Sequence, residues 1–327
     1  MPKSLLVFGN GLGRAIDNSF FSLQRALHAA WNDNDVLDEP QRQLIRRCLP
    51  EEVIEGDGAP TSEDDLDKLQ QILAACDMIN ELETETDEGW LSQRGKSFPV
   101  AIRSYVHRAA CEFHADEQAL PEEFAQPLRE FIVRTKSHVA TLNYDKLLYY
   151  NFIGTQVFHG YSCLIDGFKS GRFSKENLDR QDTARTSYYL HLHGSPLFHD
   201  DEAGGARKAH VAEVDLLAGD RSGHIVLTNV KHKRSVISAS PVLSAYWEKL
   251  DKALDEANSI TVFGYSGFDD HLNKRVQKKL KQDSNTQLRI VERRAEGSPV
   301  EREKYWNEKL GDCVLVRPEN ILEFTDW

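Results

Sequence analysis

Short runs of apolar residues, bounded by polar or turn-forming residues, recur along the chain. The strongest runs are residues 4–8, 138–142, 259–263 and 288–291, and weaker ones are 187–192, 224–228 and 313–316. Continuous apolar runs of this length are typical of strands buried on both faces of a parallel sheet. Several of them lead directly into glycine or asparagine, as in VFGNG, TLNYD and VFGYS. These residues are therefore expected at the carboxyl edge of the sheet, where open α/β sheets bind ligands.

Residues 19–136 show a different pattern, because their apolar residues recur with helical spacing within highly charged sequence. This pattern predicts a helical insertion or subdomain after the first strand. The interval 196–222 is polar and contains HDDEAGGARK, which predicts a mobile loop. We therefore expect a single α/β domain over residues 1–327, built on a mostly parallel sheet.

The charge balance argues against direct nucleic-acid binding. Forty basic residues face 52 acidic ones, giving a net charge of −12, so counterion release would contribute little to binding DNA or RNA. Two local basic segments stand out, KHKR at 231–234 and KRVQKKLKQ at 274–282. The second is interpreted as the solvated face of a helix.

The cysteines and the apolar content indicate a soluble cytoplasmic protein. The five cysteines, at positions 48, 76, 111, 163 and 313, include no close pair, which excludes a CxxC-type zinc site and disfavours a disulfide framework. A reducing compartment is expected. The apolar run near the start is too short for a signal peptide, and none reaches the length of about 18 residues typical of a membrane span.

The first candidate for chemistry is the turn Gly9-Asn10-Gly11-Leu12-Gly13. Glycines after a strand let the backbone turn sharply and approach a pyrophosphate, with N–H groups directed at its oxygens. The spacing differs from GxGxxG, and a purely structural turn remains an equal alternative.

Two further candidates follow later strands. Asn143, in TLNYD, ends a buried strand, where its amide is costly unless it is used; the alternative is that it caps the next helix. His191 and His193, in LHLHGS, lie two residues apart and face the same way on a strand. This spacing also fits one arm of a metal site, but no matching ligands are apparent, so no metal is expected.

The last two candidates are VFGYSGFDD, a strand that breaks at Gly264, and Glu292, which ends the run LRIVE. An acidic residue at a strand terminus suits the ribose hydroxyls of a dinucleotide.

Taken in order, these segments resemble the sirtuin-like (SIR2-like) family, and more closely its bacterial, zinc-free, NAD-hydrolysing branch used in antiphage defence. The branch carries T-x-N-Y-D, H-G and G-Y-S-x-x-D segments in this order. The resemblance covers about 1–13, 138–195 and 224–292, and it implies a Rossmann-like sheet that binds NAD.

The resemblance also implies roles for individual residues. Asn143 matches the catalytic asparagine, and His193 the catalytic histidine because it directly precedes Gly194. The residues that fall at the nucleotide site are Gly9, Asn10, Gly11, Leu12, Gly13, Asp145, Gly194, Gly264, Tyr265, Ser266 and Asp269, together with Glu292. The G-A-G-x-S motif, the downstream arginine segment and the four-cysteine zinc module of protein deacylases are absent here, which argues against deacylation.

The resemblance therefore implies an NAD glycohydrolase that uses NAD as a substrate, requires no metal and depletes NAD in antiphage defence. This activity is expected to be controlled by homo-oligomerisation, by the helical insertion, or by a phage-sensing or translocase-type ATPase partner. The alternatives are a regulatory module that binds NAD or ADP-ribose without cleaving it, and an NAD-dependent protein deacylase.

Overall fold

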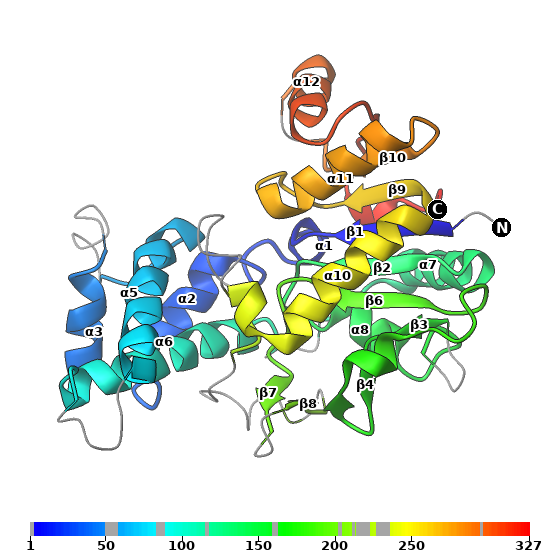
Figure 1. Cartoon of the computed structure of the whole chain (residues 1–327). Coiled ribbons are helices and arrows are strands. Elements are labelled where there is room, and N and C mark those ends of the chain that lie inside the picture. Colours follow the sequence, from blue (N-terminus) through cyan, green and yellow to red (C-terminus); the bar gives the residue numbers. More distant parts are fainter. Residues whose placement is uncertain are drawn as a thin grey trace. The chain divides into compact units, whose positions relative to one another are not determined.

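The computed structural model (Figure 1) describes residues 3–49, 58–82, 89–114, 118–158, 163–201, 205–210, 213, 223–226, 236–294 and 297–327. The chain forms two compact units. The first comprises Met1–Asn18, Glu117–Gly194 and Pro241–Trp327, and the second comprises Ser19–Asp116 and Ser195–Ser240.

The first unit is built on a seven-stranded sheet with the order β11-β10-β9-β1-β2-β6-β3, in which every pairing is parallel. Its strands are β1 (Lys3–Phe8), β2 (His138–Thr141), β3 (Leu164–Ile165), β6 (Ser187–His191), β9 (Ala257–Phe263), β10 (Gln287–Val291) and β11 (Val314–Val316). Without the short edge strand β3, this is the strand order of dinucleotide-binding sheets. The predicted α/β fold with a parallel, Rossmann-like sheet is confirmed.

The strands form where the sequence has continuous apolar runs. All four strong runs are strands, and the weaker runs 187–192 and 313–316 contain β6 and β11. Of the run 224–228, only residues 224–226 are described, and they contribute no strand to the sheet. Leu5, Val7 and Val262 have no exposed surface, as expected for strands covered on both faces.

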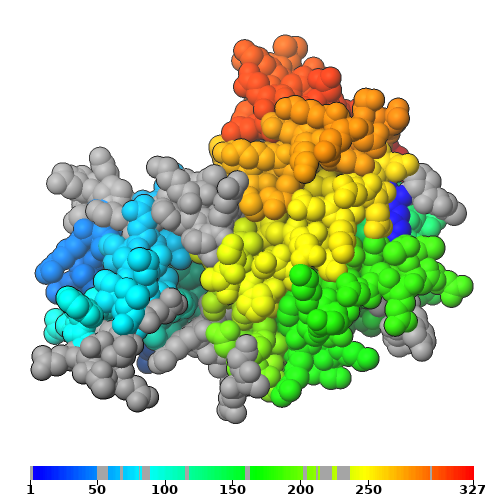
Figure 2. Space-filling model, viewed as in Figure 1, coloured from blue at the N-terminus to red at the C-terminus, as the bar shows by residue number. Residues whose placement is uncertain are grey.

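Helices cover the sheet. Helix α10 (Pro241–Glu256) contacts β6, β1 and β9, and α11 (Asp270–Gln282) packs beside it; Figure 2 shows them side by side in yellow and orange. The aromatic ring of Phe124, in α7 (Glu122–Thr135), lies 5.3 Å from that of Phe263. The remaining helical elements are α1 (Gly11–Arg14), α8 (Leu147–Phe152), α12 (Pro299–Lys309), η1 (Lys175–Leu178) and η3 (Ile321–Glu323), and β4 (Phe168–Lys169) pairs with β5 (Arg172–Phe173).

The second unit is mainly helical. Its elements are α2 (Leu23–Trp31), α3 (Glu39–Arg46), α5 (Glu63–Leu82), α6 (Gln93–Cys111), β7 (Phe198–Asp200) and β8 (Ala206–Lys208). Helix α6 packs against α2 and α5, with the ring of Trp31 edge-on to Tyr105. Much of the helical interval predicted at 19–136 lies here, whereas α7 belongs to the first unit.

Part of the interval 196–222, predicted as a mobile loop, forms the antiparallel pair β7–β8. Residues 202–204, 211–212 and 214–222 of this interval lie outside the described residues, as does the basic segment 231–234. The other basic segment, 274–282, lies in α11, with Lys274, Lys278 and Lys281 exposed as predicted. Among the described residues, no helix combines the length and the apolar character needed to cross a membrane.

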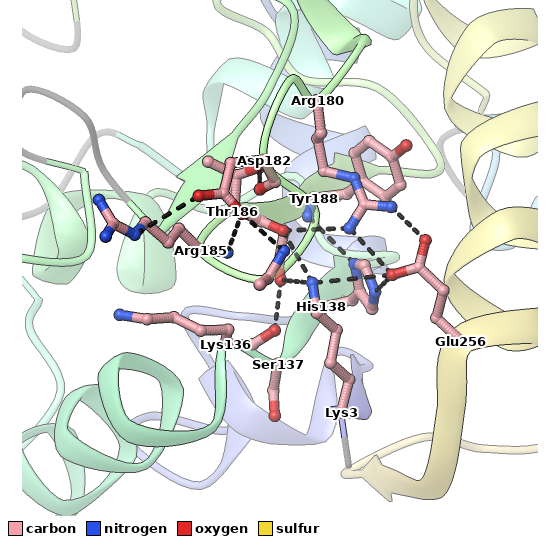
Figure 3. Close-up of polar contacts among 12 residues, drawn as sticks. Lys3, Lys136, Ser137, His138, Arg180, Asp182, Arg185, Thr186, Tyr188 and Glu256 are labelled. Carbon is pink, nitrogen blue, oxygen red and sulfur yellow. Dashed lines mark hydrogen bonds and ion pairs between the residues drawn. The ribbon is translucent and has the colours of Figure 1, made fainter. Parts of the chain in front are cut away.

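A polar network joins the amino ends of the central strands (Figure 3). Glu256, at the end of α10, accepts hydrogen bonds from Arg180 (3.0 Å) and from Nε2 of His138 (3.2 Å), and Nζ of Lys3 lies 3.7 Å away. Nδ1 of His138 accepts the backbone N–H of Tyr188 at 3.2 Å. His138 is therefore neutral with its proton on Nε2, in keeping with a pKa that burial lowers to about 4.

Candidate functional site

The carboxyl ends of four adjacent strands form one row. Thr141 on β2 is in register with Phe8 on β1 and with His191 on β6, and Phe8 is in register with Phe263 on β9. The chain adds strands to one side of β1 first and to the other side afterwards, so β1 lies at the point where the strand order reverses. Ligands of open α/β sheets bind at such a point.

Two glycine turns meet at this point. Gly9 N and Gly11 N donate to the carbonyl oxygens of Phe263 (2.9 Å) and Gly264 (2.7 Å). A Cβ on Gly11 would lie 2.6 Å from the Gly264 oxygen, and one on Gly264, whose φ is +60°, would lie 2.8 Å from Leu12 N. The glycines are therefore required for backbone-to-backbone contact, and two of the amides assigned to a phosphate donate within the protein.

The other residues of these turns have varied surroundings. Leu12 and Gly13 are buried in α1, and Asn10 occupies its N-cap position without a side-chain capping bond. Gly194 follows His193 with a φ of +84°. Ser266 is exposed, so its side chain is open to a ligand.

Asn143 is anchored beside the first glycine turn. Its Nδ2 donates to Gly9 O (3.1 Å) and its backbone N–H to Oγ1 of Thr141 (3.1 Å). The side chain is buried, and Oδ1 has no hydrogen-bond partner among the described residues. Asn143 does not cap α8, whose N-cap is Lys146. A buried, unused amide oxygen is costly, so the structure favours the interpretation in which a ligand uses this group.

Asp145 lies two residues further along the same segment and is also buried. Its Oδ1 accepts the backbone N–H of Leu147 at 2.9 Å, whereas Oδ2 has no partner among the described residues. Burial raises the pKa of this carboxyl to about 6. Asn143 and Asp145 thus place two unused polar atoms after β2.

His193 follows β6, on one side of β1, and is paired with a carboxylate that follows β9, on the other side of β1. Its Nε2 lies 2.8 Å from Oδ2 of Asp269, and both side chains are buried. The preceding residue, Leu192, is held in place by α10, because Trp247 Nε1 donates a hydrogen bond to Leu192 O at 2.9 Å. The ring of Tyr144, next to Asn143, lies 6.3 Å from that of His193. The segments after β2, β6 and β9 are therefore brought together at this edge.

His191 has a different environment. Its ring packs edge-on against Tyr189 at 4.8 Å and lies 6.1 Å from the ring of Tyr149. Among the described residues, no group of three or more His, Cys, Asp or Glu side chains is arranged to hold a metal ion.

Glu292 has contacts that the sequence did not indicate. Its carboxylate accepts from Arg302 (3.0 Å) and Trp306 Nε1 (2.7 Å), and Arg317 Nε lies 3.2 Å away. The side chain is buried. Both carboxylate oxygens are thus engaged within the protein, which disfavours the predicted ribose contact.

The sequence did not indicate Asn273 either. This buried residue of α11 accepts a hydrogen bond from the hydroxyl of Tyr265 at 3.0 Å. Its position four residues after Asp269 is the signal that could have revealed it, because residues i and i+4 of a helix are neighbours.

These groups provide a defined chemical capacity. His193 is an imidazole held by a carboxylate, the usual arrangement of a general base. Asn143 offers a neutral amide oxygen that can orient a hydroxyl or water without adding a buried charge. The arrangement is suited to proton transfer next to a centre that develops positive charge.

Comparison with known proteins agrees with this geometry. A family model for the SIR2-like domain matches residues 137–313, more than half of the chain. The matched range contains Asn143, His193 and Asp269, and the turn at residues 9–13 precedes it. A search of curated proteins finds no significant match.

Proposed function

The chain belongs to the SIR2-like family, whose activities are NAD-related, and on this premise we propose that it is an NAD glycohydrolase that produces nicotinamide and ADP-ribose. The observation that carries the proposal is the buried amide oxygen of Asn143, which has no partner among the described residues, at the same sheet edge as the His193–Asp269 pair.

The chemistry of the reaction requires such groups. Breaking the bond between nicotinamide and ribose develops an oxocarbenium-like centre at the anomeric carbon. Asn143 orients the attacking water or a ribose hydroxyl, and its neutrality avoids a second charge that would have to be desolvated. His193 takes up the proton that the nucleophile releases.

The remaining predicted residues form the binding side of the proposed site. The turns around Gly9–Gly13 and Gly264 let the backbone lie close to the dinucleotide, and Gly194 and Ser266 border the same edge. Because Gly9 N donates to the last residue of β9 and Gly11 N to Gly264 after it, a phosphate at this edge is held by other donors. Asp145 supplies a polar atom close to Asn143.

The biological role is proposed from the resemblance. We assign the chain to antiphage defence as a cytoplasmic effector that depletes NAD, controlled by homo-oligomerisation or by a phage-sensing or translocase-type ATPase partner. Depletion of cellular NAD on phage infection, absent in cells carrying His193→Ala, is the expected observation.

The direct test is nicotinamide release from NAD by the purified protein without any acyl peptide. We expect Asn143→Ala and His193→Ala each to reduce the rate by about 100-fold or more, whereas His28→Ala, a change at an exposed histidine of α2, leaves it unchanged.

Full activity in both site variants would refute the proposal. If the wild type binds NAD and releases no nicotinamide, even with a partner present, the chain is a binding module. Release that depends on an acylated peptide would indicate a deacylase.

A further inference from the structure

The segment between β9 and α11 closes on itself through side-chain hydrogen bonds. The backbone N–H of Asp269 donates to the hydroxyl of Tyr265 (2.6 Å), which donates to Oδ1 of Asn273 (3.0 Å). Nδ2 of Asn273 in turn donates to Gly267 O at 2.8 Å. All three side chains are buried, so these hydrogen bonds are shielded from water.

This closed loop ends in a carboxylate with two separate partners. Oδ1 of Asp269 caps α11, accepting the backbone N–H groups of His271 (2.9 Å) and Leu272 (3.1 Å). Oδ2 faces Nε2 of His193 at 2.8 Å. The capping bonds fix the rotation of the carboxylate and therefore the direction from which it meets His193.

The pairing determines where His193 carries its proton. An ionised carboxylate only accepts hydrogen bonds, so Nε2 must be the protonated nitrogen and Nδ1 holds the lone pair in the neutral ring. The Tyr265 hydroxyl stays protonated, since burial raises its pKa well above the usual range. It can then accept from Asp269 N–H and donate to Asn273 at once.

We infer that Asp269 is the positioning residue that fixes the Nε2–H tautomer of His193, and that Tyr265 and Asn273 serve to hold Asp269 in place. Tyr265 and Asp269 are thereby assigned to His193 rather than to direct contact with the nucleotide. The catalytic meaning of this inference rests on the proposed function; the tautomer and the hydrogen bonds that fix it do not.

The decisive variant is Asp269→Asn. Asparagine is also a good helix N-cap, so the cap of α11 and the fold are expected to persist. Its amide group donates to Nε2, the proton moves to Nδ1, and the ring loses the lone pair that acts as base. We expect kcat for NAD cleavage to fall by about 10²- to 10⁴-fold, as when a tautomer-fixing carboxylate is replaced in a catalytic triad, with KM changed less than about threefold.

The measurement that reports the tautomer is nitrogen-15 NMR of protein labelled at histidine, with the His193 signals identified by their loss in His193→Gln. In the wild type, Nε2 is expected to show the shift of a protonated nitrogen and Nδ1 that of an unprotonated one. In Asp269→Asn the assignment is expected to be reversed. The control, Asp270→Asn, removes the adjacent carboxylate and should leave both the spectrum and the kinetics unchanged.

A second pair of variants tests the support of Asp269. Tyr265→Phe removes the acceptor of Asp269 N–H, and Asn273→Leu removes the acceptor of Tyr265 O–H. Each should reduce kcat by about 3- to 30-fold while KM is retained, and should allow the His193 Nε2 proton to exchange faster with solvent. Unchanged kcat and unchanged exchange in both variants would overturn their assigned role.

The outcomes separate this inference from the proposed function. An Nδ1-protonated His193 in the wild type would overturn the inference, whether or not NAD is cleaved. Full activity in Asp269→Asn, with activity lost in His193→Ala, would overturn it while leaving the glycohydrolase proposal intact. Absence of cleavage by the wild type, together with an Nε2-protonated ring whose proton moves to Nδ1 in Asp269→Asn, would overturn the glycohydrolase proposal and leave this inference intact.

Discussion

At the scale of single residues, the buried carboxyl of Asp145 destabilises the fold when it is ionised. The folded protein binds its proton more tightly than the unfolded chain, since burial raises its pKa to about 6 from an ordinary value near 4. Its contribution to stability is therefore complete below pH 4 and is lost as the pH rises through 6. Retaining an ionised carboxyl there near pH 7 is consistent with a role in the site.

Asp145→Asn is therefore expected to stabilise the protein at pH 7.5 by about 2 kcal/mol, and to have little effect at pH 4. Asparagine keeps the acceptor for Leu147 N–H, so the helix start is preserved. The free energy of unfolding, measured by urea titration at both pH values, checks this. Asp145→Ala is the comparison, because it removes the same charge and also loses that acceptor, so it should be less stable than Asp145→Asn at both pH values. A stabilisation by Asp145→Asn that is equal at pH 4 and 7.5 would exclude the titration as its cause.

At the scale of elements, the turn after β1 and the turn after β9 depend on each other. Gly264 has a φ of +60°, and a Cβ there would lie 2.8 Å from Leu12 N, a backbone atom that cannot swing away. Gly154 provides a matched position, with a φ of +72° and nothing within 4 Å of its added Cβ. The pair separates backbone strain from steric collision.

Gly264→Ala should lower the free energy of unfolding by about 3 kcal/mol or more, through left-handed strain and overpacking together. Gly154→Ala should cost about 1 kcal/mol, from strain alone. Thermal unfolding of the two variants beside the wild type makes the comparison. Equal losses would show that the contact between the turns contributes nothing.

The elements also show what a sequence can and cannot reveal. Six of the seven strands of the main sheet were predictable because each lies in a continuous apolar run, whereas the two-residue strand β3 was not. Asn143 and His193 could be singled out because each directly follows such a run. The contacts of Glu292 were not, because Arg302 and Trp306 reach it from helix α12 and Arg317 from the residue after β11, all later in the chain. Local patterns give the strand ends and carry no information on which distant side chains fill the space beside them.

At the scale of the whole first unit, the network around Glu256 ties together four segments that are remote in sequence (Figure 3). The Arg180 side chain is 3% exposed and that of Lys3 11%, whereas Glu256 retains 32%. Removal of the Glu256 charge leaves the two poorly solvated cations, Lys3 and Arg180, next to each other. Losing one partner of an ion pair lowers the free energy of unfolding more when the remaining charge is more deeply buried.

We expect Glu256→Gln to reduce the free energy of unfolding by about 2 kcal/mol, less than for a fully buried pair because Glu256 is partly exposed. Glu248→Gln breaks the exposed ion pair with Lys175 and should cost about 0.5 kcal/mol or less. Urea denaturation at neutral pH measures both. Similar values for the two variants would show that the network adds no more than a surface ion pair.

The strand order also has a consequence for how the protein is made. Strand β1 leaves the ribosome before the other strands of the sheet, yet its neighbours in the sheet are residues 138–141 and 257–263, and the carboxylate that meets His193 follows later still. Contacts so remote in sequence form late in folding. A nascent chain that holds β1, Asn143 and His193 but not yet Asp269 lacks the imidazole–carboxylate pair, so under the proposed function we expect unfinished copies of the protein not to cleave NAD.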